Sequence, residues 1–113
     1  MRKSFWKNKR VFVTGHTGFK GSWLVLILNH LGAKVTGYAL NPISKPNFFD
    51  DLKLTKLLEK DYRQDIQNFS NLNKAINKSK PNIVFHLAAQ SSVLVSYKNP
   101  DDTLKTNVIG TFN

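Results

Sequence analysis

The sequence predicts an α/β fold, a doubly wound parallel sheet of which this chain supplies the first four strands in the order 3-2-1-4. Two observations lead to this prediction. Residues 10–14 form a short apolar run that ends at a glycine-rich segment, and an apolar helix begins directly after that segment. A second strand-like run follows at residues 34–39, so strand, helix and strand fit within about thirty residues, as in the βαβ unit.

A change of pattern marks the first strand and the first helix. Residues 10–14 are rich in β-branched and aromatic side chains, as expected of a parallel strand that is buried on both faces. The apolar residues after Phe19 instead cover a wide helical face, and they are Trp23, Leu24, Leu26, Ile27, Leu28 and Leu31. Gly32 is a stop signal, so we expect a buried helix that begins at Phe19 and ends before this glycine.

The middle of the chain predicts weaker elements. Residues 48–58 are compatible with a short helix, and residues 61–63 with a third strand. Asn68 or Ser70 can cap a further helix that runs to about Ser79. The chain therefore continues to alternate between strand and helix.

The fourth strand bears on domain organisation. Residues 83–88 are continuous and apolar, and a last helix is expected after Asn99-Pro100. In the order 3-2-1-4 this apolar strand is an exposed edge, which favours wrong pairing. We therefore expect residues 1–113 to be the N-terminal part of a Rossmann domain, with the rest of the sheet and a substrate domain outside this chain.

Composition excludes several classes of protein. The formal net charge is +10, and eight Lys and Arg residues but no acidic residue precede Asp50. This charge favours anionic ligands, but the basic residues are scattered along the chain, so no nucleic-acid partner is expected. The absence of cysteine excludes disulfides and thiolate metal sites. No segment resembles a signal peptide or a membrane span, so we expect a cytoplasmic protein without a membrane partner.

Three glycines between the first strand and the first helix can each be given a separate task. Gly15 allows the tight turn, Gly18 lets the backbone approach a pyrophosphate, and Gly21 lets the helix pack closely on the strand. The helix N-terminus presents free N–H groups and a positive dipole end, and Thr17 can add a hydroxyl donor. Because a strand precedes this motif and a helix follows it, we expect it to bind a nicotinamide dinucleotide.

The end of the second strand lacks the acidic residue that usually binds the adenosine ribose. Asn41 occupies this place, where it can bond a ribose hydroxyl or simply form part of a turn. Since no carboxylate stands there to repel a 2′-phosphate, NADP stays open beside the expected NAD.

Two further segments are candidates for cofactor contacts. Asp65 and Ile66 follow the weak third strand and can hold the adenine amino group, although a solvated loop aspartate fits equally well. Residues 87–90 lie at the carboxyl end of the fourth strand, where a doubly wound sheet binds its ligands. Their small side chains give a cofactor room, or alternatively allow close packing.

Other catalytic chemistries lack the residues that they need. His16, His30 and His86 do not share metal-ligand spacing, so no metal site is expected, and His86 is interpreted as a core histidine. The serines of residues 91–96 have no base and acid companion and no nucleophile elbow, which excludes a serine hydrolase.

The most specific sequence of the chain is residues 9–24, preceded by Phe5-Trp6. By these residues the chain resembles the extended short-chain dehydrogenase/reductase family, and within it most closely the CDP-glucose 4,6-dehydratases. Relatives that act on other sugar nucleotides rarely share the combination of His16, Lys20 and Trp23. Weaker matches are Asp65-Ile66, residues 86–90, Ser96-Tyr97 with Pro100, residues 106–108 and Gly110-Thr111.

One departure from the family pattern concerns the substrate. Leu94 stands where the family often has an arginine, and the neighbouring residues 90–97 are more similar to GDP-mannose 4,6-dehydratases. The resemblance therefore leaves GDP-mannose or another nucleotide sugar as an alternative substrate.

The resemblance implies an NAD-dependent lyase of nucleotide-sugar metabolism. Such enzymes use bound NAD to oxidise the sugar C4 hydroxyl, lose water across C5 and C6, and return the hydride to C6. The product, a 4-keto-6-deoxy sugar nucleotide, feeds polysaccharide synthesis. Dimers are common in the family, which allows a homodimer of the intact protein.

The expected site residues all belong to cofactor binding. The family's catalytic Tyr-x-x-x-Lys lies beyond Asn113, so no catalytic residue is expected here and the chain alone is expected to be inactive. A non-catalytic dinucleotide-binding or interaction module is the alternative of another class. The residues expected to contact the cofactor are Gly15, Thr17, Gly18, Phe19, Lys20, Gly21, Asn41, Asp65, Ile66, Leu87, Ala88, Ala89, Gln90 and Asn107.

Overall fold

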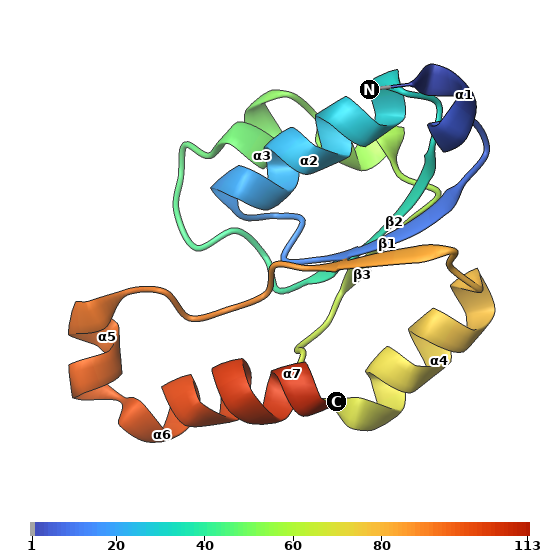
Figure 1. Ribbon diagram of the computed structural model, residues 1–113. Helices are drawn as coiled ribbons and strands as arrows, with labels where there is room; N and C mark the ends of the chain where they lie inside the picture. Colours follow the sequence, from blue (N-terminus) through green and yellow to red (C-terminus); the bar gives the residue numbers. More distant parts are fainter. Residues whose placement is uncertain (1) are drawn as a thin grey trace.

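Four strands form one parallel sheet in the order β3-β2-β1-β4 in the computed structural model, which describes residues 2–113 (Figure 1). The strands are β1 (Arg10–Thr14), β2 (Lys34–Ala39), β3 (Lys60–Arg63) and β4 (Ile83–His86). β1 lies in the middle, with Val11 paired to Val35 of β2 on one side and to Ile83 of β4 on the other. The predicted α/β class and strand order are confirmed.

Helices cover both faces of the sheet, as a doubly wound fold requires (Figure 1). On one face lie α2 (Phe19–His30), α3 (Phe48–Asp51) and the 3₁₀ turn η1 (Leu54–Leu57). On the other face lie α4 (Phe69–Ser79) and the C-terminal helices α6 (Pro100–Leu104) and α7 (Gly110–Phe112). The sheet is therefore the middle layer of three.

The core divides along the alternation of β1. Val11 and Val13 pack toward α2 with its Val25 and Leu28. Phe12 faces the other way, in a cluster with Tyr38 of β2, Ile66, Leu72 and Ala75. Both faces of β1 are buried, and this explains why residues 10–14 read as a continuous apolar run.

Several elements differ from the sequence expectation in their extent. The helix expected at residues 48–58 is divided into α3 and η1, because Lys53 between them has a left-handed φ of 51°. β4 ends at His86, and the chain then leaves the sheet and forms α5 (Val93–Lys98), which was not expected. The short α1 (Lys3–Trp6) was also not expected.

The last predicted helix is present but interrupted by a wider turn. It begins with α6 at Pro100, continues through the π-helical η2 (Lys105–Ile109), and ends in α7. Asn68 caps α4 as predicted, because its Oδ1 accepts a hydrogen bond of 2.9 Å from the Asn71 N–H. Within residues 2–113, no helix has the length and apolar character to cross a membrane.

The interpretation of His86 as a core histidine is wrong. His86 is exposed at the end of β4, which has only β1 as a neighbouring strand in the described chain. Its Nδ1 lies 2.7 Å from Thr14 Oγ1, and its Nε2 lies 2.9 Å from Thr111 Oγ1. The ring therefore links β1 to the C-terminal helix at the sheet edge.

Candidate functional site

A cleft of about 590 Å³ lies at the carboxyl ends of the strands. Its walls are the glycine loop after β1, the segments that follow β2 and β3, and Leu87, Ala88, Ala89 and Ser91 after β4. β1 and β4 are neighbours here, and the connections from these strands leave to opposite faces of the sheet. This is the switch point at which doubly wound sheets bind their ligands.

The glycine loop forms the floor of this cleft, and two of its glycines are required by packing. Gly15 has a φ of +76°, and a Cβ there would lie 2.7 Å from the Ala88 nitrogen. A Cβ on Gly21 would overlap the Gly15 carbonyl oxygen. Both positions therefore bring backbone segments closer together than any side chain would allow, as the sequence predicted.

Gly18 differs from the other two glycines because protein packing does not require it. A Cβ there would meet only the Gly15 oxygen, at 3.4 Å, and the residue is exposed to the cleft. Gly18 is also the N-cap of α2, and no side chain within residues 2–113 caps this helix end. The first N–H groups of α2 are thus available to an anionic ligand, since no acidic side chain occupies the first turn.

Ten of the fourteen predicted contact residues line the cleft together. They are Gly15, Thr17, Gly18, Phe19, Asn41, Asp65, Ile66, Leu87, Ala88 and Ala89. The Thr17 hydroxyl, however, donates to the Leu40 carbonyl oxygen at 2.8 Å. It connects the glycine loop to the end of β2 and keeps only its acceptor capacity for a ligand.

The other four predicted residues do not line the cleft. Lys20 is exposed on α2, and Gly21 is buried beneath the loop. Asn107 and Gln90 bond each other instead: Asn107 Oδ1 accepts from the Gln90 N–H at 2.7 Å, and Asn107 Nδ2 donates to the Gln90 carbonyl at 2.9 Å. This pair fixes the segment after β4 against η2.

Sequence reasoning missed several lining residues. Ser91 follows Gln90 in the sequence and Thr106 precedes Asn107. Ser91 and Thr106 line the cleft, whereas Gln90 and Asn107 do not. Phe48 also lines the cleft, and its ring stacks on Trp23 at 4.8 Å between centroids. The Trp23 that marks the sequence motif therefore holds the segment after β2 against α2. No local sequence pattern in residues 90–107 distinguishes Ser91 or Thr106 as a lining residue.

Asp65 and Ile66 lie where the sequence placed them, at the end of β3. Asp65 Oδ1 accepts a hydrogen bond of 2.9 Å from the Gln67 N–H, and its carbonyl accepts one of 3.0 Å from the Tyr38 hydroxyl. The Ile66 side chain is buried in the core, so only part of the residue faces the cleft. These bonds hold the Asp65 carboxylate close to its own turn.

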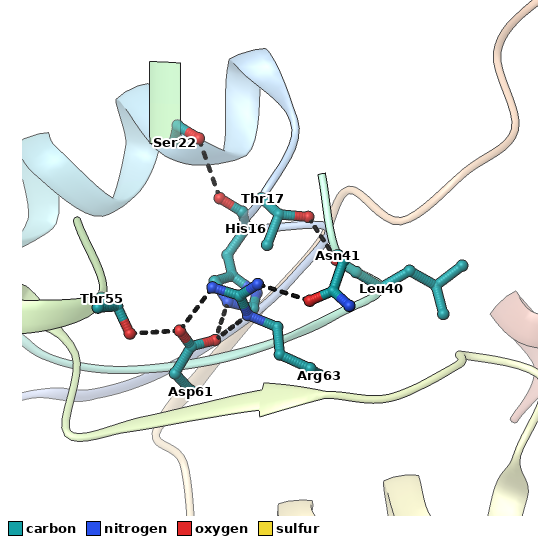
Figure 2. A network of polar contacts seen from close by, with 8 residues as sticks. All are labelled: His16, Thr17, Ser22, Leu40, Asn41, Thr55, Asp61 and Arg63. Carbon is teal, nitrogen blue, oxygen red and sulfur yellow. Dashed lines mark hydrogen bonds and ion pairs between the residues drawn. The ribbon is translucent and has the colours of Figure 1, made fainter. Parts of the chain in front are cut away.

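A buried polar network supports the wall formed by the glycine loop and the end of β2 (Figure 2). The His16 side chain is fully buried, and its ring occupies the space that a Cβ on Gly37 would need. His16 Nε2 lies 2.6 Å from Asp61 Oδ1 on β3. Sequence reasoning noted His16 as part of a motif and proposed no role for it; the structure makes it the link between the loop and β3.

Asp61 is the centre of this network. Its carboxylate accepts two hydrogen bonds from Arg63, from Nε at 2.8 Å and from Nη2 at 3.0 Å, and another from Thr55. Although burial works against ionisation, these bonds and the one from His16 lower the pKa of Asp61 to about 2. Burial lowers the pKa of His16 despite its contact with Asp61. At neutral pH the network thus holds a carboxylate, a guanidinium and a neutral imidazole.

The sequence pattern of the family described as GDP-mannose 4,6 dehydratase matches residues 12–113. The chain belongs to this family. It is 52% identical over 109 residues to a CDP-glucose 4,6-dehydratase of Salmonella typhimurium, and the match covers 96% of this chain and 30% of that protein. A probable dTDP-glucose 4,6-dehydratase of Sinorhizobium fredii is 39% identical, and the match covers 91% of this chain and 29% of that protein. The resemblance inferred from residues 9–24 is thereby confirmed.

Solved structures of the same architecture support the fold. A UDP-glucose 4-epimerase of Thermotoga maritima, solved with UDP-glucose, has a TM-score of 0.76 at 32% identity, covering 90% of this chain and 31% of that one. A UDP-glucose 4-epimerase of Brucella ovis in complex with NAD has a TM-score of 0.75 at 26% identity, covering 92% and 30%. The chain thus spans less than a third of the length of these relatives.

Proposed function

We propose that this chain is the cofactor-binding portion of a nucleotide-sugar 4,6-dehydratase that converts CDP-glucose to CDP-4-keto-6-deoxyglucose. The single observation that carries the proposal is the cradle made by Gly15, Gly18 and Gly21 beneath the uncapped N-terminus of α2. The 52% identity to a CDP-glucose 4,6-dehydratase supports this substrate over GDP-mannose. Residues 1–113 would then form the first part of an NAD(P)-binding domain, and the substrate domain would belong to the rest of the protein.

The cleft suits a nicotinamide dinucleotide in shape and in charge. The backbone N–H groups at Gly18 and Phe19 would receive the pyrophosphate, and the segment after β2 would receive the adenosine. The small side chains of Ala88 and Ala89 would leave room beside β4 for the rest of the molecule. When bound, the cofactor supplies a hydride acceptor for the sugar C4 position and a hydride donor for C6. The chain's own residues bind and orient it and exclude water from one side.

A charge placed at Gly18 tests the proposal directly. In Gly18→Asp a carboxylate caps α2 and opposes the pyrophosphate, whereas Gly18→Asn caps the helix without charge. We expect Gly18→Asp to be as stable as the unchanged chain, or more stable by a few tenths of a kcal/mol, roughly as caps differ. We expect it to lose at least about tenfold in affinity for NADH, because a pyrophosphate bonded to backbone N–H groups is a charge-assisted contact.

The measurement is a fluorescence titration of the chain with NADH beside a thermal melt. Affinity retained in Gly18→Asp, or no binding by the unchanged chain, would contradict the assignment of the cleft. The catalytic part of the proposal needs a longer protein. A chimera in which residues 1–113 replace the matching part of the Salmonella typhimurium relative should dehydrate CDP-glucose, and a folded chimera that fails to do so while still binding NADH would limit the chain to dinucleotide binding.

A further inference from the structure

A second cavity lies at the amino ends of the strands, at the opposite edge of the sheet from the cleft (Figure 1). It measures about 240 Å³ and is bounded by the first residues of β1, β2 and β3 and by the C-terminal end of α4. Four cationic side chains and one acidic side chain line it, and they are Arg10, Lys34, Lys60, Lys78 and Glu59. The cavity is therefore positively charged, and it shares no lining residue with the cleft.

Each of β1, β2 and β3 begins with a cationic residue, and the strand register places these residues close together. They are Arg10, Lys34 and Lys60. Arg10 pairs with Lys34, and Lys60 pairs with Thr36, two residues further along β2. All four residues share the α4 face of the sheet, because the intervening Val11 packs toward α2. The positive charge is thus concentrated at one corner of the sheet.

Arg10 is held in place at the end of α4. Its Nε donates a hydrogen bond of 2.7 Å to the Lys80 carbonyl oxygen, and its backbone N–H donates one of 3.0 Å to Asn82 Oδ1. Within residues 2–113, its Nη groups make no hydrogen bond to another residue. A guanidinium is always charged and only donates, so these groups are available to an anion.

The neighbouring lysines are not neutralised by acidic side chains. Lys34, Lys60 and Lys78 take part in no ion pair in the part of the chain that the structure describes, and neither does Glu59. Like charges on neighbouring strands repel each other. An anion in the cavity would replace this repulsion by attraction.

The cavity also contains a hydroxyl without a protein partner. Thr36 lines the cavity with only 7% of its surface exposed, and its hydroxyl makes no hydrogen bond to another group among residues 2–113. Buried polar groups in proteins are nearly always hydrogen-bonded. A hydroxyl in a cavity lined by cations is suited to donate to a bound oxyanion.

We propose that this cavity binds a compact phosphate-bearing ligand, held by Arg10, Lys34 and Lys60 with Thr36 as a hydroxyl donor. Its volume is below the roughly 300 Å³ at which pockets for drug-sized ligands begin, so it suits one or two phosphate groups and not a whole dinucleotide. Guanidinium and ammonium groups are the usual partners of phosphate. The site is separate from the cleft, and the inference does not depend on dinucleotide binding.

Calorimetric titration of the 113-residue chain with sodium pyrophosphate, against sodium chloride of the same ionic strength, measures this binding. Lys34→Gln combined with Lys60→Gln should weaken it by at least about tenfold, because two charge-assisted contacts are lost. Lys56→Gln combined with Lys98→Gln is the matched control, since it removes the same charge from η1 and α5, outside the cavity. This control should leave the affinity unchanged.

Thr36→Val separates a ligand contact from a merely structural residue. Valine keeps the shape of threonine and removes the hydroxyl, so we expect a chain that is at least as stable but binds pyrophosphate several-fold more weakly. If the double lysine variant is not folded by circular dichroism, Thr36→Val alone decides. Gly18→Asp, which opposes an anion in the cleft, should leave a pyrophosphate site of unchanged affinity.

Glycerol 2-phosphate identifies the source of the phosphate. Binding as tight as that of pyrophosphate supports a phosphate ester as the ligand, and weaker binding supports a free diphosphate. Binding of neither compound overturns the proposal, as does an affinity that survives the double lysine substitution or Thr36→Val, or that Gly18→Asp abolishes. None of these results bears on NADH binding in the cleft, and a failure of NADH to bind leaves this site intact.

Discussion

His16 connects three parts of the cleft wall through a single residue. Its ring donates to Asp61 on β3, and its carbonyl oxygen accepts a hydrogen bond of 3.1 Å from Ser22 Oγ on α2. Gly37 on β2 provides the space for the ring. Nδ1 is buried without a partner among residues 2–113, so the neutral ring with its proton on Nε2 suits the ionised Asp61. His16, which the sequence identifies only as part of a motif, is thus a structural link between the glycine loop and the sheet.

Because of the same network, the free energy of unfolding should fall as the pH is lowered. Folding lowers the pKa of His16 below 6.5, so under acid the unfolded chain takes up a proton that the folded chain does not. Folding also lowers the pKa of Asp61 from 3.8 to about 2. The free energy of unfolding should therefore fall as pH drops below 6.5, and fall again between 3.8 and about 2 by roughly 2 kcal/mol.

Urea unfolding of the chain at several pH values measures this. Asp61→Asn removes the ion pair, so it should lower the free energy of unfolding at pH 7 and lose the second acid phase. Asp101→Asn is the control, because it removes only the solvent-exposed ion pair between Asp101 on α6 and Lys105 on η2, which water and salt screen. An acid profile of Asp61→Asn that coincides with the unchanged chain would show that Asp61 is not the group that titrates.

At the scale of single elements, the C-terminus of α4 contains a residue in an unfavourable conformation. Lys80 ends this helix with a φ of 44° and a ψ of 59°, the left-handed region that costs a residue with a Cβ about 1 kcal/mol. Lys80→Gly should therefore stabilise the chain, by up to roughly 1 kcal/mol. Lys78→Gly, two residues earlier in the same helix, should destabilise it by about the same amount. Thermal melts of the two variants should shift in opposite directions, and two equal downward shifts would be evidence against this account.

The elements that the sequence predicted best are those whose side chains are buried on both faces. β1 and β2 match residues 10–14 and 34–39 because, after an exposed first residue, every position of these inner strands is buried and the side chains are mostly apolar. The single helix expected at residues 48–58 was not predicted correctly. This short segment is also rich in apolar residues, but nothing in the local sequence shows that Lys53 adopts the left-handed conformation that divides it. α5 was missed for a related reason: five of its six residues are exposed, so the helix has no buried face whose periodicity could be detected, although Ser92 caps it.

At the scale of the whole molecule, the sequence predicted the part of the cleft that one continuous segment forms. The glycine loop is such a segment, and its strand, turn and helix are local features that fix Gly15, Gly18 and Gly21 in space. The support behind it depends on pairing between distant strands: His16 meets Asp61 across 45 residues only because β1, β2 and β3 are neighbours. Ser91 and Thr106 likewise reach the cleft through the packing of η2 on the segment after β4.

The C-terminal third of the described chain exposes many apolar side chains, and this predicts a property of the chain in solution. Val93, Leu94, Tyr97, Leu104 and Phe112 are each more than half exposed along α5, α6 and α7. Apolar surface of this extent favours association, whereas the net charge of +10 opposes it by repulsion that salt screens.

We therefore expect the chain to self-associate more strongly as salt rises, the reverse of an association driven by charge. Sedimentation velocity over a range of protein and salt concentrations measures this. Leu94→Lys combined with Leu104→Lys should weaken association at every salt concentration, because both changes put charge on the apolar surface. Ile27→Lys combined with Leu52→Lys is the control, since it adds the same charge at partly exposed apolar positions on the opposite face of the sheet, where α2 and α3 lie. Association that weakens with salt, or that this control disrupts as strongly, would assign it to a different surface.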